Sequence, residues 1–215
     1  MAGSLKAPAI KAILIDHLIN AIRGNIIIAS EVPFIAGKRW ADILLIENTS
    51  IHAFEIKSAV DSLDRLKEQT TDYLDTFDYV TLVVSKKHVS EARKLITDYV
   101  GIVSFDDETG QLKQLRKPQK RLRQRKEYLL NFLWRADLLK IVRKKSPING
   151  QAPEASYLRR KALEIYSKDE IHDMAIVALK GRYGSRYKNF LDERGQKTLI
   201  EDLPLLTTTQ PELLS

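Results

Sequence analysis

Apolar residues recur with a helical spacing near the start of the chain and in short β-branched runs after it. Ile10, Leu14 and Leu18 mark one helical stripe, and Gly24 follows it, so the sequence predicts a helix over residues 8–22. Further helices are expected at 61–76 and 90–99, and strands at 26–32, 40–46, 51–57, 79–85, 102–105 and 111–115. Because helices separate several of these strands, the order predicts an α/β fold with a mixed central sheet and helices on both faces.

The strands at 40–46 and 51–57 are close enough in sequence to form a hairpin around residues 47–50. Pairing through this turn places Asp42 directly opposite Glu55, with their Cβ atoms roughly 5 Å apart. Lys57 lies two positions further on and shares the same face of the sheet. The neighbouring paired positions are apolar on both faces, so three charges at this point are costly unless they are paired or bind a cation.

Two carboxylates in close contact repel each other unless they share a cation. Hard oxygen ligands suit Mg²⁺ or Mn²⁺, so Asp42, Glu55 and the backbone carbonyl of Ile56 are candidate metal ligands. Lys57 would then hold or help deprotonate a water molecule that attacks a phosphodiester. The simpler alternative is a solvated ion pair, because a Glu and a Lys two positions apart on a strand are common at protein surfaces.

Asp42 followed after twelve residues by Glu55-Ile56-Lys57 resembles the core signature of the PD-(D/E)XK restriction-endonuclease-like nuclease superfamily. More narrowly, it resembles a small, little-characterised prokaryotic and phage branch of that superfamily. Ala41 stands where the motif's name has proline. The resemblance implies a restriction-endonuclease-like central sheet, with Asp42 and Glu55 as ligands of Mg²⁺ and Lys57 assisting the nucleophilic water.

Three further residues extend this resemblance on either side of the hairpin. Glu31 lies where many members carry an additional acidic residue, and its role as a metal ligand is left open because an intervening loop decides its position. Gln69 and Tyr73, on the helix expected at 61–76, resemble the Gln-containing motif of one broad branch. They would support the site or the substrate.

Positive charge is concentrated in one part of the chain. Residues 111–145 carry 13 Lys and Arg against 2 Asp and Glu, whereas residues 1–110 carry 12 against 16. Such a segment is typical of a surface that binds a polyanion, although a solvated helical face is the alternative. The candidate nucleic-acid contacts lie in the first half of an expected helix: Lys117, Lys120, Arg121, Arg123, Arg125 and Lys126. No base-reading module is recognisable, so these residues would contact phosphates.

The sequence divides into an expected nuclease-like core at 1–116, a basic helical extension at 117–204 and a disordered tail at 205–215. Within the extension, helices are expected at 154–166 and after a capping box at 167–170. Residues 181–188 mix glycines with basic and aromatic residues, which indicates either a nucleic-acid contact or a helix end followed by an ordinary surface loop.

The composition excludes several classes of protein. The chain has no cysteine, so disulfide scaffolds, thiolate zinc sites and cysteine nucleophiles are excluded, and a reducing cytoplasmic location is expected. No apolar run approaches the roughly 18 residues that a membrane-spanning helix needs. The expected protein is therefore soluble and does not bind a membrane.

These observations together predict a Mg²⁺-dependent endonuclease that hydrolyses phosphodiester bonds in DNA. One alternative is a nucleic-acid-binding protein that keeps the nuclease scaffold without catalysis, and another is a nuclease subunit that a partner protein targets. A homodimer is compatible with the sequence, which leaves the oligomeric state open.

Overall fold

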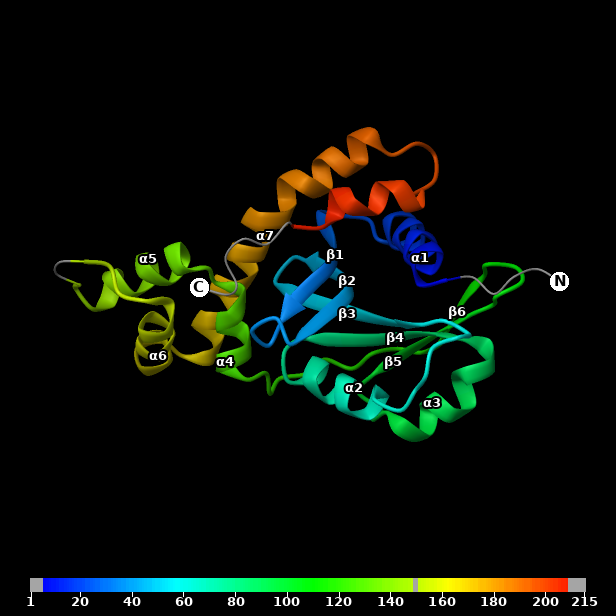
Figure 1. Cartoon of the computed structure of the whole chain (residues 1–215), viewed down its shortest axis with the longest axis horizontal. Helices are drawn as coiled ribbons and strands as arrows, with labels where there is room; N and C mark the ends of the chain where they lie inside the picture. The colour runs from blue at the N-terminus through cyan, green and yellow to red at the C-terminus, as the bar shows by residue number, and fades with distance from the viewer. Residues whose placement is uncertain (1–5, 149–150, 209–215) are drawn as a thin grey trace.

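The computed structural model describes residues 6–148 and 151–208, and a six-stranded sheet lies at its centre (Figure 1). The strand order follows the chain: β1 (Ile26–Phe34), β2 (Arg39–Glu47), β3 (Ser50–Lys57), β4 (Tyr79–Ser85), β5 (Gly101–Phe105) and β6 (Leu112–Arg116). The strands β3, β4 and β5 run parallel, and the other neighbours are antiparallel. The predicted α/β fold with a mixed central sheet is therefore confirmed.

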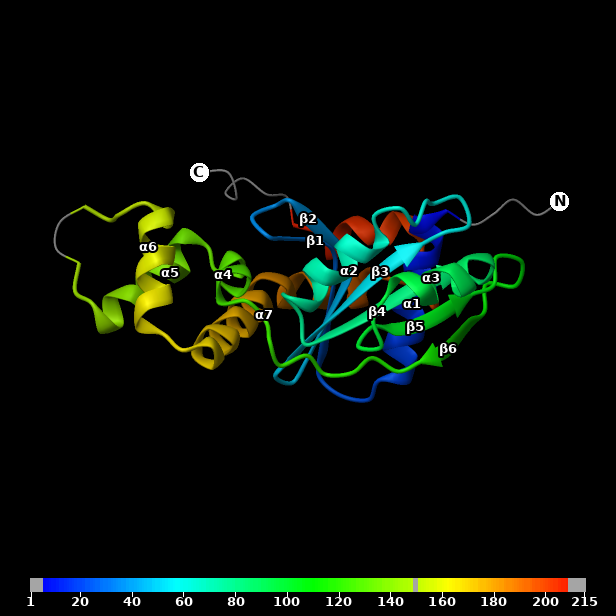
Figure 2. The same ribbon diagram turned by 90° about the horizontal axis from the view of Figure 1, so that it is seen from below.

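Helices cover both faces of this sheet and also form a lobe beyond one end of it (Figure 2). The α-helices are α1 (Ala7–Ala21), α2 (Leu66–Leu74), α3 (Val89–Leu95), α4 (Lys126–Leu129), α5 (Arg135–Lys145), α6 (Ala155–Ile165) and α7 (Lys168–Glu193). The 3₁₀ helices among the described residues are η1 (Lys86–His88), η2 (Leu130–Phe132) and η3 (Ile200–Leu206). The crossovers through α2 and α3 both join parallel strands, and right-handed crossovers place such helices on the same face.

The register of the β2–β3 hairpin is the predicted one. Ile43 pairs with Phe54, Leu44 with Ala53 and Glu47 with Ser50. The turn needs one residue with positive φ, and Asn48 adopts it at 50°. Asp42 and Glu55 follow directly on the Ile43–Phe54 pair, at the point where the two strands separate.

Two hydrophobic clusters fill the space on either side of the sheet. One joins α2 and α3 to the helical lobe and to the first half of α7. The other joins α1 to the end of α7 and to η3, through residues such as Tyr187 and Phe190. Both clusters contain residues from before and after position 116, so the core and the extension share their apolar packing. The division of the chain into a core at 1–116 and an extension at 117–204 stays a prediction.

Residues 117–125 do not form the helix that was expected there. They run as an extended connection between β6 and α4, and the amide groups of Gln119, Arg121 and Arg125 donate to the carbonyls of Tyr99, Asp78 and Asp75. Pro118 contributes to this outcome because proline removes an amide donor and disfavours helix at the preceding residue. The apolar half of the expected helix is divided between α4, η2 and α5.

The surface loop expected at 181–188 was also wrong, because α7 continues through it for a total of 26 residues. The capping box at its start is confirmed, since the Ser167 hydroxyl accepts from the Glu170 amide. Gly184 lies close to strand β1, where an added Cβ would be 3.7 Å from Ile27 Cδ1. Burial of Tyr183 and Tyr187 on the same stretch outweighs the modest cost of glycine in a helix.

The first residues of the tail expected from residue 205 are helical instead. Leu205 and Leu206 belong to η3, and Leu206 is completely buried against the second cluster. The remainder of the expected tail, at 209–215, lies outside the described residues.

A buried carboxylate ties the sheet to the extended connection and to α7. Asp78 precedes β4 and accepts from the Ile51 amide at 2.8 Å, from Gln124 Nε2 at 2.9 Å and from His172 Nε2 at 2.9 Å. These three donors come from β3, from the connection and from α7. Since a buried acceptor that loses its donors is costly, Asp78 joins three parts of the chain that are distant in sequence.

We expect Asp78→Asn to lower the free energy of unfolding by about 2 kcal/mol, because an amide cannot accept from all three donors. Chemical denaturation measures this change, and Asp192→Asn, an exposed position on α7, is the matched control. Equal stability of the two variants would show that the Asp78 contacts contribute nothing.

Candidate functional site

One pocket of about 390 Å³ contains every residue of the predicted catalytic and metal-binding set. Strand β1 contributes one acid, the β2–β3 hairpin contributes the central charges, and helix α2 closes one side. The members that were predicted are Glu31, Asp42, Glu55, Ile56, Lys57, Gln69 and Tyr73. The lining also includes residues that the sequence did not single out: Ala7, Lys38, Arg39, Trp40, Asp61 and Arg65.

The backbone leaves its regular pairing where Glu31 and Asp42 lie. Ser30 pairs with Ile43 and Val32 pairs with Ala41, but Glu31 itself has a φ of 52° and interrupts the ladder. This left-handed conformation is uncommon for a residue other than glycine. It brings both carboxylates to the pocket, where Asp42 Oδ2 accepts from the amide of Ile56 at 2.8 Å.

The Glu55 carboxylate is buried and held by three side chains. Lys57 Nζ lies 2.7 Å from Oε1, and Gln69 Nε2 donates to the same oxygen at 3.1 Å. The Tyr73 hydroxyl lies 2.5 Å from Oε2. Helix α2 thus presents Gln69 and Tyr73 four positions apart, on one face, to a strand residue that lies 14 and 18 positions earlier.

Lys11 of α1 is the residue of this site that the sequence did not reveal. Its ammonium forms ion pairs with Glu31 and with Asp42 Oδ1, the latter at 3.0 Å, and its side chain is only 7% exposed. A lysine within the apolar stripe of an expected helix, next to Ile10, was the available signal. Only the tertiary packing of α1 against the strands shows which acids it meets.

The electrostatic balance of the pocket raises the pKa of Asp42 to about 6. Burial is the main cause and the charge of Glu55 adds to it, whereas Lys11 and the Ile56 amide act in the opposite direction. Burial alone would lower the pKa of Lys11, but the charges of Asp42 and Glu31 outweigh burial and raise it. Lys11 and Asp42 therefore stabilise each other's charged forms, whereas burial disfavours the charged form of Asp42.

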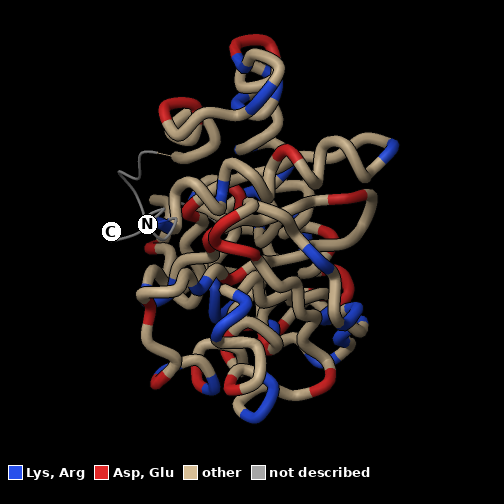
Figure 3. Tube along the Cα trace, turned by 90° about the vertical axis from the view of Figure 1, so that its right-hand side faces the viewer, with Lys and Arg blue, Asp and Glu red and all other residues tan. Residues whose placement is uncertain are grey.

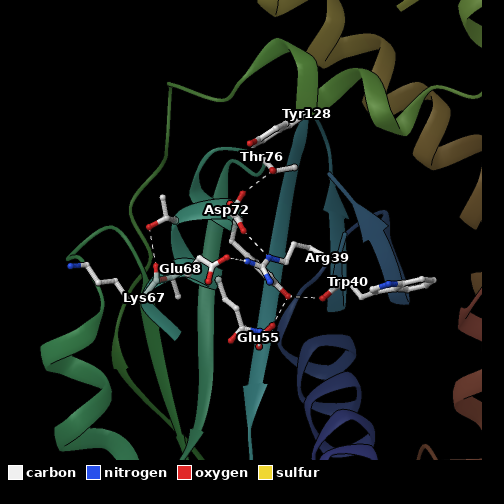
Figure 4. A network of polar contacts seen from close by, with 12 residues as sticks. Arg39, Trp40, Glu55, Lys67, Glu68, Asp72, Thr76 and Tyr128 are labelled. Atoms are coloured by element: carbon white, nitrogen blue, oxygen red, sulfur yellow. Dashed lines mark hydrogen bonds and ion pairs between the residues drawn. The ribbon is translucent and has the colours of Figure 1, made fainter. Parts of the chain in front are cut away.

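A second group of charges closes the rim of the pocket beside α2 (Figure 4). Arg39 Nε donates to Asp72 Oδ2 at 2.7 Å, and another nitrogen of the same guanidinium pairs with Glu68. The carbonyl of Trp40 lies 3.0 Å from the Tyr73 hydroxyl. Strand β2 is thereby attached to α2 by side chains on both sides of Glu55.

The donors present leave little room for a metal ion. Each oxygen of Asp42 and Glu55 already accepts from a protein donor, and Lys11 and Lys57 balance two of the three negative charges. Among residues 6–148 and 151–208, no group of three acidic or imidazole side chains has a geometry that could hold a metal. The described residues therefore fit Mg²⁺ or Mn²⁺ poorly, and binding of either ion stays a prediction.

The six predicted nucleic-acid contacts do not line this pocket. Lys117, Lys120 and Arg123 are exposed on the extended connection. The other three engage the protein itself: Arg121 lies over the Tyr99 ring, Arg125 over the Tyr128 ring, and Lys126 donates to the Leu163 carbonyl at 2.8 Å. The connection contacts Asp78, directly before β4, whereas Lys57 of the pocket pairs with Val84 near the end of β4. The connection and Lys57 therefore lie at opposite ends of this strand.

Comparison with known families covers almost the whole chain. The model of the family described as bacteriophage P4 protein cII matches residues 1–207. The chain belongs to the bacteriophage P4 protein cII family. A curated relative, protein cII of Enterobacteria phage P4, is 32% identical over 217 residues, which cover 96% of this chain and 80% of that protein.

A solved structure with a partly similar fold is the SPO1766 protein of unknown function from Silicibacter pomeroyi. The two share 12% sequence identity with a TM-score of 0.43, over 89% of this chain and 97% of that one.

The family match corrects the identification made from the sequence. The assignment to the PD-(D/E)XK nuclease superfamily was wrong, because a match over residues 1–207 identifies the cII family instead. The predicted Mg²⁺-dependent deoxyribonuclease was wrong for the same reason. The physical reason is that Asp42, Glu55 and Lys57 are common residue types whose register any hairpin with this turn produces, and that Lys11 balances their charge within the protein.

No helix within the described parts of the chain combines the length and apolar character that a bilayer crossing requires. Cytoplasmic location stays a prediction.

The raised pKa of Asp42 predicts a dependence of stability on pH. Between its ordinary value of 3.8 and about 6, the folded chain keeps a proton that the unfolded chain has lost. The free energy of unfolding therefore falls as the pH rises through this window, by up to about 3 kcal/mol from this group. Asp42→Asn removes the titrating group, so we expect a flatter profile in urea denaturation between pH 4 and pH 8.

Asp192→Asn at an exposed position of α7 is the control for this measurement, and it should retain the wild-type profile. Identical slopes for the wild type and Asp42→Asn would contradict the assigned cause.

Removal of the Lys11 ammonium should destabilise the chain in a pH-dependent manner. Lys11→Met leaves Asp42 buried beside Glu55 without its main counter-charge, so we expect a loss of about 3 kcal/mol at pH 8 and a smaller loss at pH 5, where Asp42 takes up a proton. Lys94→Met, an exposed position on α3, is the control. A loss that is the same at both pH values would contradict the ion-pair explanation.

The same variant tests the metal prediction. Because Lys11 holds the place of a cation, we expect millimolar Mg²⁺ to raise the melting temperature of Lys11→Met and to leave that of the wild type unchanged. Wild-type binding of Mg²⁺ in calorimetry, abolished by Asp42→Asn, would instead support the metal site.

Proposed function

We propose that this protein binds nucleic acid, with duplex DNA as its ligand, through the extended basic connection at residues 117–125. The observation that carries the proposal is the positive charge of residues 111–145, which contain 13 basic residues and 2 acidic residues. A polyanion with regularly spaced phosphates is the ligand that such a segment attracts. The residues after 145 carry 10 basic and 10 acidic residues, so the attraction is specific to this segment.

The surface beyond this segment supports the same interpretation. Figure 3 shows Lys and Arg positions interspersed with Asp and Glu positions along the Cα trace, so basic residues do not predominate throughout the chain. A general excess of surface charge would attract polyanions anywhere on the molecule. A local excess instead favours one binding orientation.

The exposed cations of the connection are free to reach phosphates. Lys117, Lys120 and Arg123 have no ion pair with any acidic side chain in the described part of the chain. They recur every three residues along an extended backbone, which spaces them by roughly 10 Å. Their side chains can therefore contact successive phosphates of one backbone.

The backbone of the connection is held in place before any ligand binds. Its amides donate to the carbonyls of Tyr99, Asp78 and Asp75 at 3.0, 2.7 and 2.7 Å, and the buried Gln124 side chain donates to Asp78. Ordering a flexible segment on binding reduces affinity, so this anchoring reduces the entropic cost. It also explains how a segment without regular secondary structure can present a fixed row of charges.

Binding through phosphates alone is expected to be insensitive to base sequence. The proposed contacts position the protein on its ligand, and no described element presents a recognisable base-reading motif. A protein partner that supplies targeting and a homodimer are both compatible with this proposal, and both stay predictions.

Loss of the three free cations should weaken binding and reduce its dependence on salt. For Lys117→Ala/Lys120→Ala/Arg123→Ala we expect the negative slope of log K against log salt to become shallower by about 3, because each phosphate contact contributes about 0.9 to its magnitude. Fluorescence anisotropy with a labelled duplex at several salt concentrations measures this slope, and an RNA duplex of the same sequence tests the preference for DNA.

The matched control is Lys87→Ala/Arg93→Ala/Lys94→Ala, which removes three exposed cations around η1 and α3. Equal losses in the two triple variants would attribute binding to net charge alone. Absence of binding by the wild type at low salt would refute the proposal.

A further inference from the structure

We propose that a second pocket, between the β1–β2 turn and helices α4 and α6, is a binding site for a phosphate group. This cationic pocket has a volume of about 370 Å³. Its lining includes the turn residues Ile35, Ala36 and Lys38, and also Arg159 and Arg160 of α6. None of these residues belongs to the predicted nucleic-acid contacts.

Three cations converge on the cationic pocket, and none of them is held by an ion pair within the described residues. Lys38, Arg159 and Arg160 form no ion pair with any acid among residues 6–148 and 151–208. The one acid in the lining, Glu127, lies 3.9 Å from Arg125. Like charges that are placed together repel each other, so a bound anion would stabilise the arrangement.

Arg159 gives the strongest indication of a ligand. Its Nε is inaccessible to solvent, and it has no hydrogen-bond partner in the described structure. Burial also lowers its pKa, because desolvation disfavours the charged form. A buried donor without an acceptor is rare and costly, so an oxygen acceptor from a ligand would satisfy it.

The β1–β2 turn holds Lys38 at the pocket through a tight hairpin turn. Ile35 and Ala36 have φ values of 49° and 54°, in the left-handed region that residues with a Cβ rarely adopt. The turn is closed by donation from the Gly37 amide to the Phe34 carbonyl at 3.1 Å, and the Ile35 side chain packs against the core. Positive φ at both central residues is what a tight hairpin turn of this hand requires, so the turn fixes where Lys38 emerges beside the pocket.

The chemistry of the lining favours phosphate over a carboxylate. A phosphate carries more charge and more acceptor oxygens, and it can accept from two arginines and a lysine together. The hydroxyl of Ser156 and the amide of Asn131 also line the pocket and can add hydrogen bonds. The volume leaves space for the group that is attached to the phosphate.

The cationic pocket shares a lining residue with the pocket that contains Asp42, and it contacts the end of the basic connection. Arg125 at the end of the connection donates to the Tyr128 hydroxyl at 3.0 Å, and Tyr128 lines the cationic pocket. Lys38 lines both the cationic pocket and the charged pocket that contains Asp42. The phosphate can therefore come from a nucleic-acid backbone that follows the connection, or from a free phosphorylated molecule.

Inorganic pyrophosphate is the probe for the site itself, followed by NMR of the arginine Nε–H groups. We expect the Arg159 signal to shift on titration, and the affinity to fall about tenfold in Lys38→Ala/Arg160→Ala, because two charge-assisted contacts are lost. Both substituted positions are exposed, so this variant should fold. The matched control Arg93→Ala/Lys94→Ala removes two exposed cations of α3 and should keep the wild-type affinity.

Two duplexes, one with a 5′-hydroxyl and one with a 5′-phosphate, identify the source of the phosphate. Displacement of pyrophosphate by both duplexes indicates a backbone phosphate. Displacement by the 5′-phosphorylated duplex alone indicates a terminal phosphate. Displacement by neither duplex indicates a free phosphorylated molecule. The duplex experiment rests on the proposed function, whereas the pyrophosphate titration does not, so their failures are distinguishable. An Arg159 signal that does not move with pyrophosphate, or an equal loss of affinity in the control variant, would overturn the proposal.

Discussion

The ammonium of Lys11 lies between carboxylates on two strands, and the geometry of the charged pocket depends on this contact. Asp42 and Glu55 converge where β2 and β3 separate, and burial makes their proximity unfavourable. Lys11 and Lys57 balance these charges, one from α1 and one from β3. The same ion pairs attach α1 to the sheet, so charge balance and the packing of the first helix are one constraint.

This constraint explains how a correct geometric prediction accompanied a wrong identification. Every predicted member of the catalytic and metal-binding set lines one pocket, as the hairpin register required. The pattern of Asp42, Glu55 and Lys57 nevertheless specifies only that charges meet at a sheet end, and lysines can neutralise carboxylates as well as a metal can. A family match that covers residues 1–207 depends on far more positions than a three-residue motif.

Tertiary contacts also determine where positive charge gathers at the surface. The basic connection is held by Asp78, which also joins β3 and α7, and its exposed lysines therefore face solvent in a fixed row. The cationic pocket brings Lys38 of one hairpin together with Arg159 and Arg160 of a helix about 120 positions later. Both features present several cations that no acid within the described residues neutralises, which is the basis for the proposed binding of phosphates.

Local pattern determined much of this protein. The strands, the hairpin register, the α/β class and the capping box of α7 follow from periodicity and turn chemistry, which act over a few residues. Tertiary structure decided the remainder: Lys11 became a partner of Asp42, residues 117–125 became extended, and α7 continued through Gly181 and Gly184. In each case, contacts with residues distant in sequence decided the outcome, and the neighbouring sequence, such as Lys11 beside Ile10 or Pro118 in the connection, does not identify the partners of those contacts.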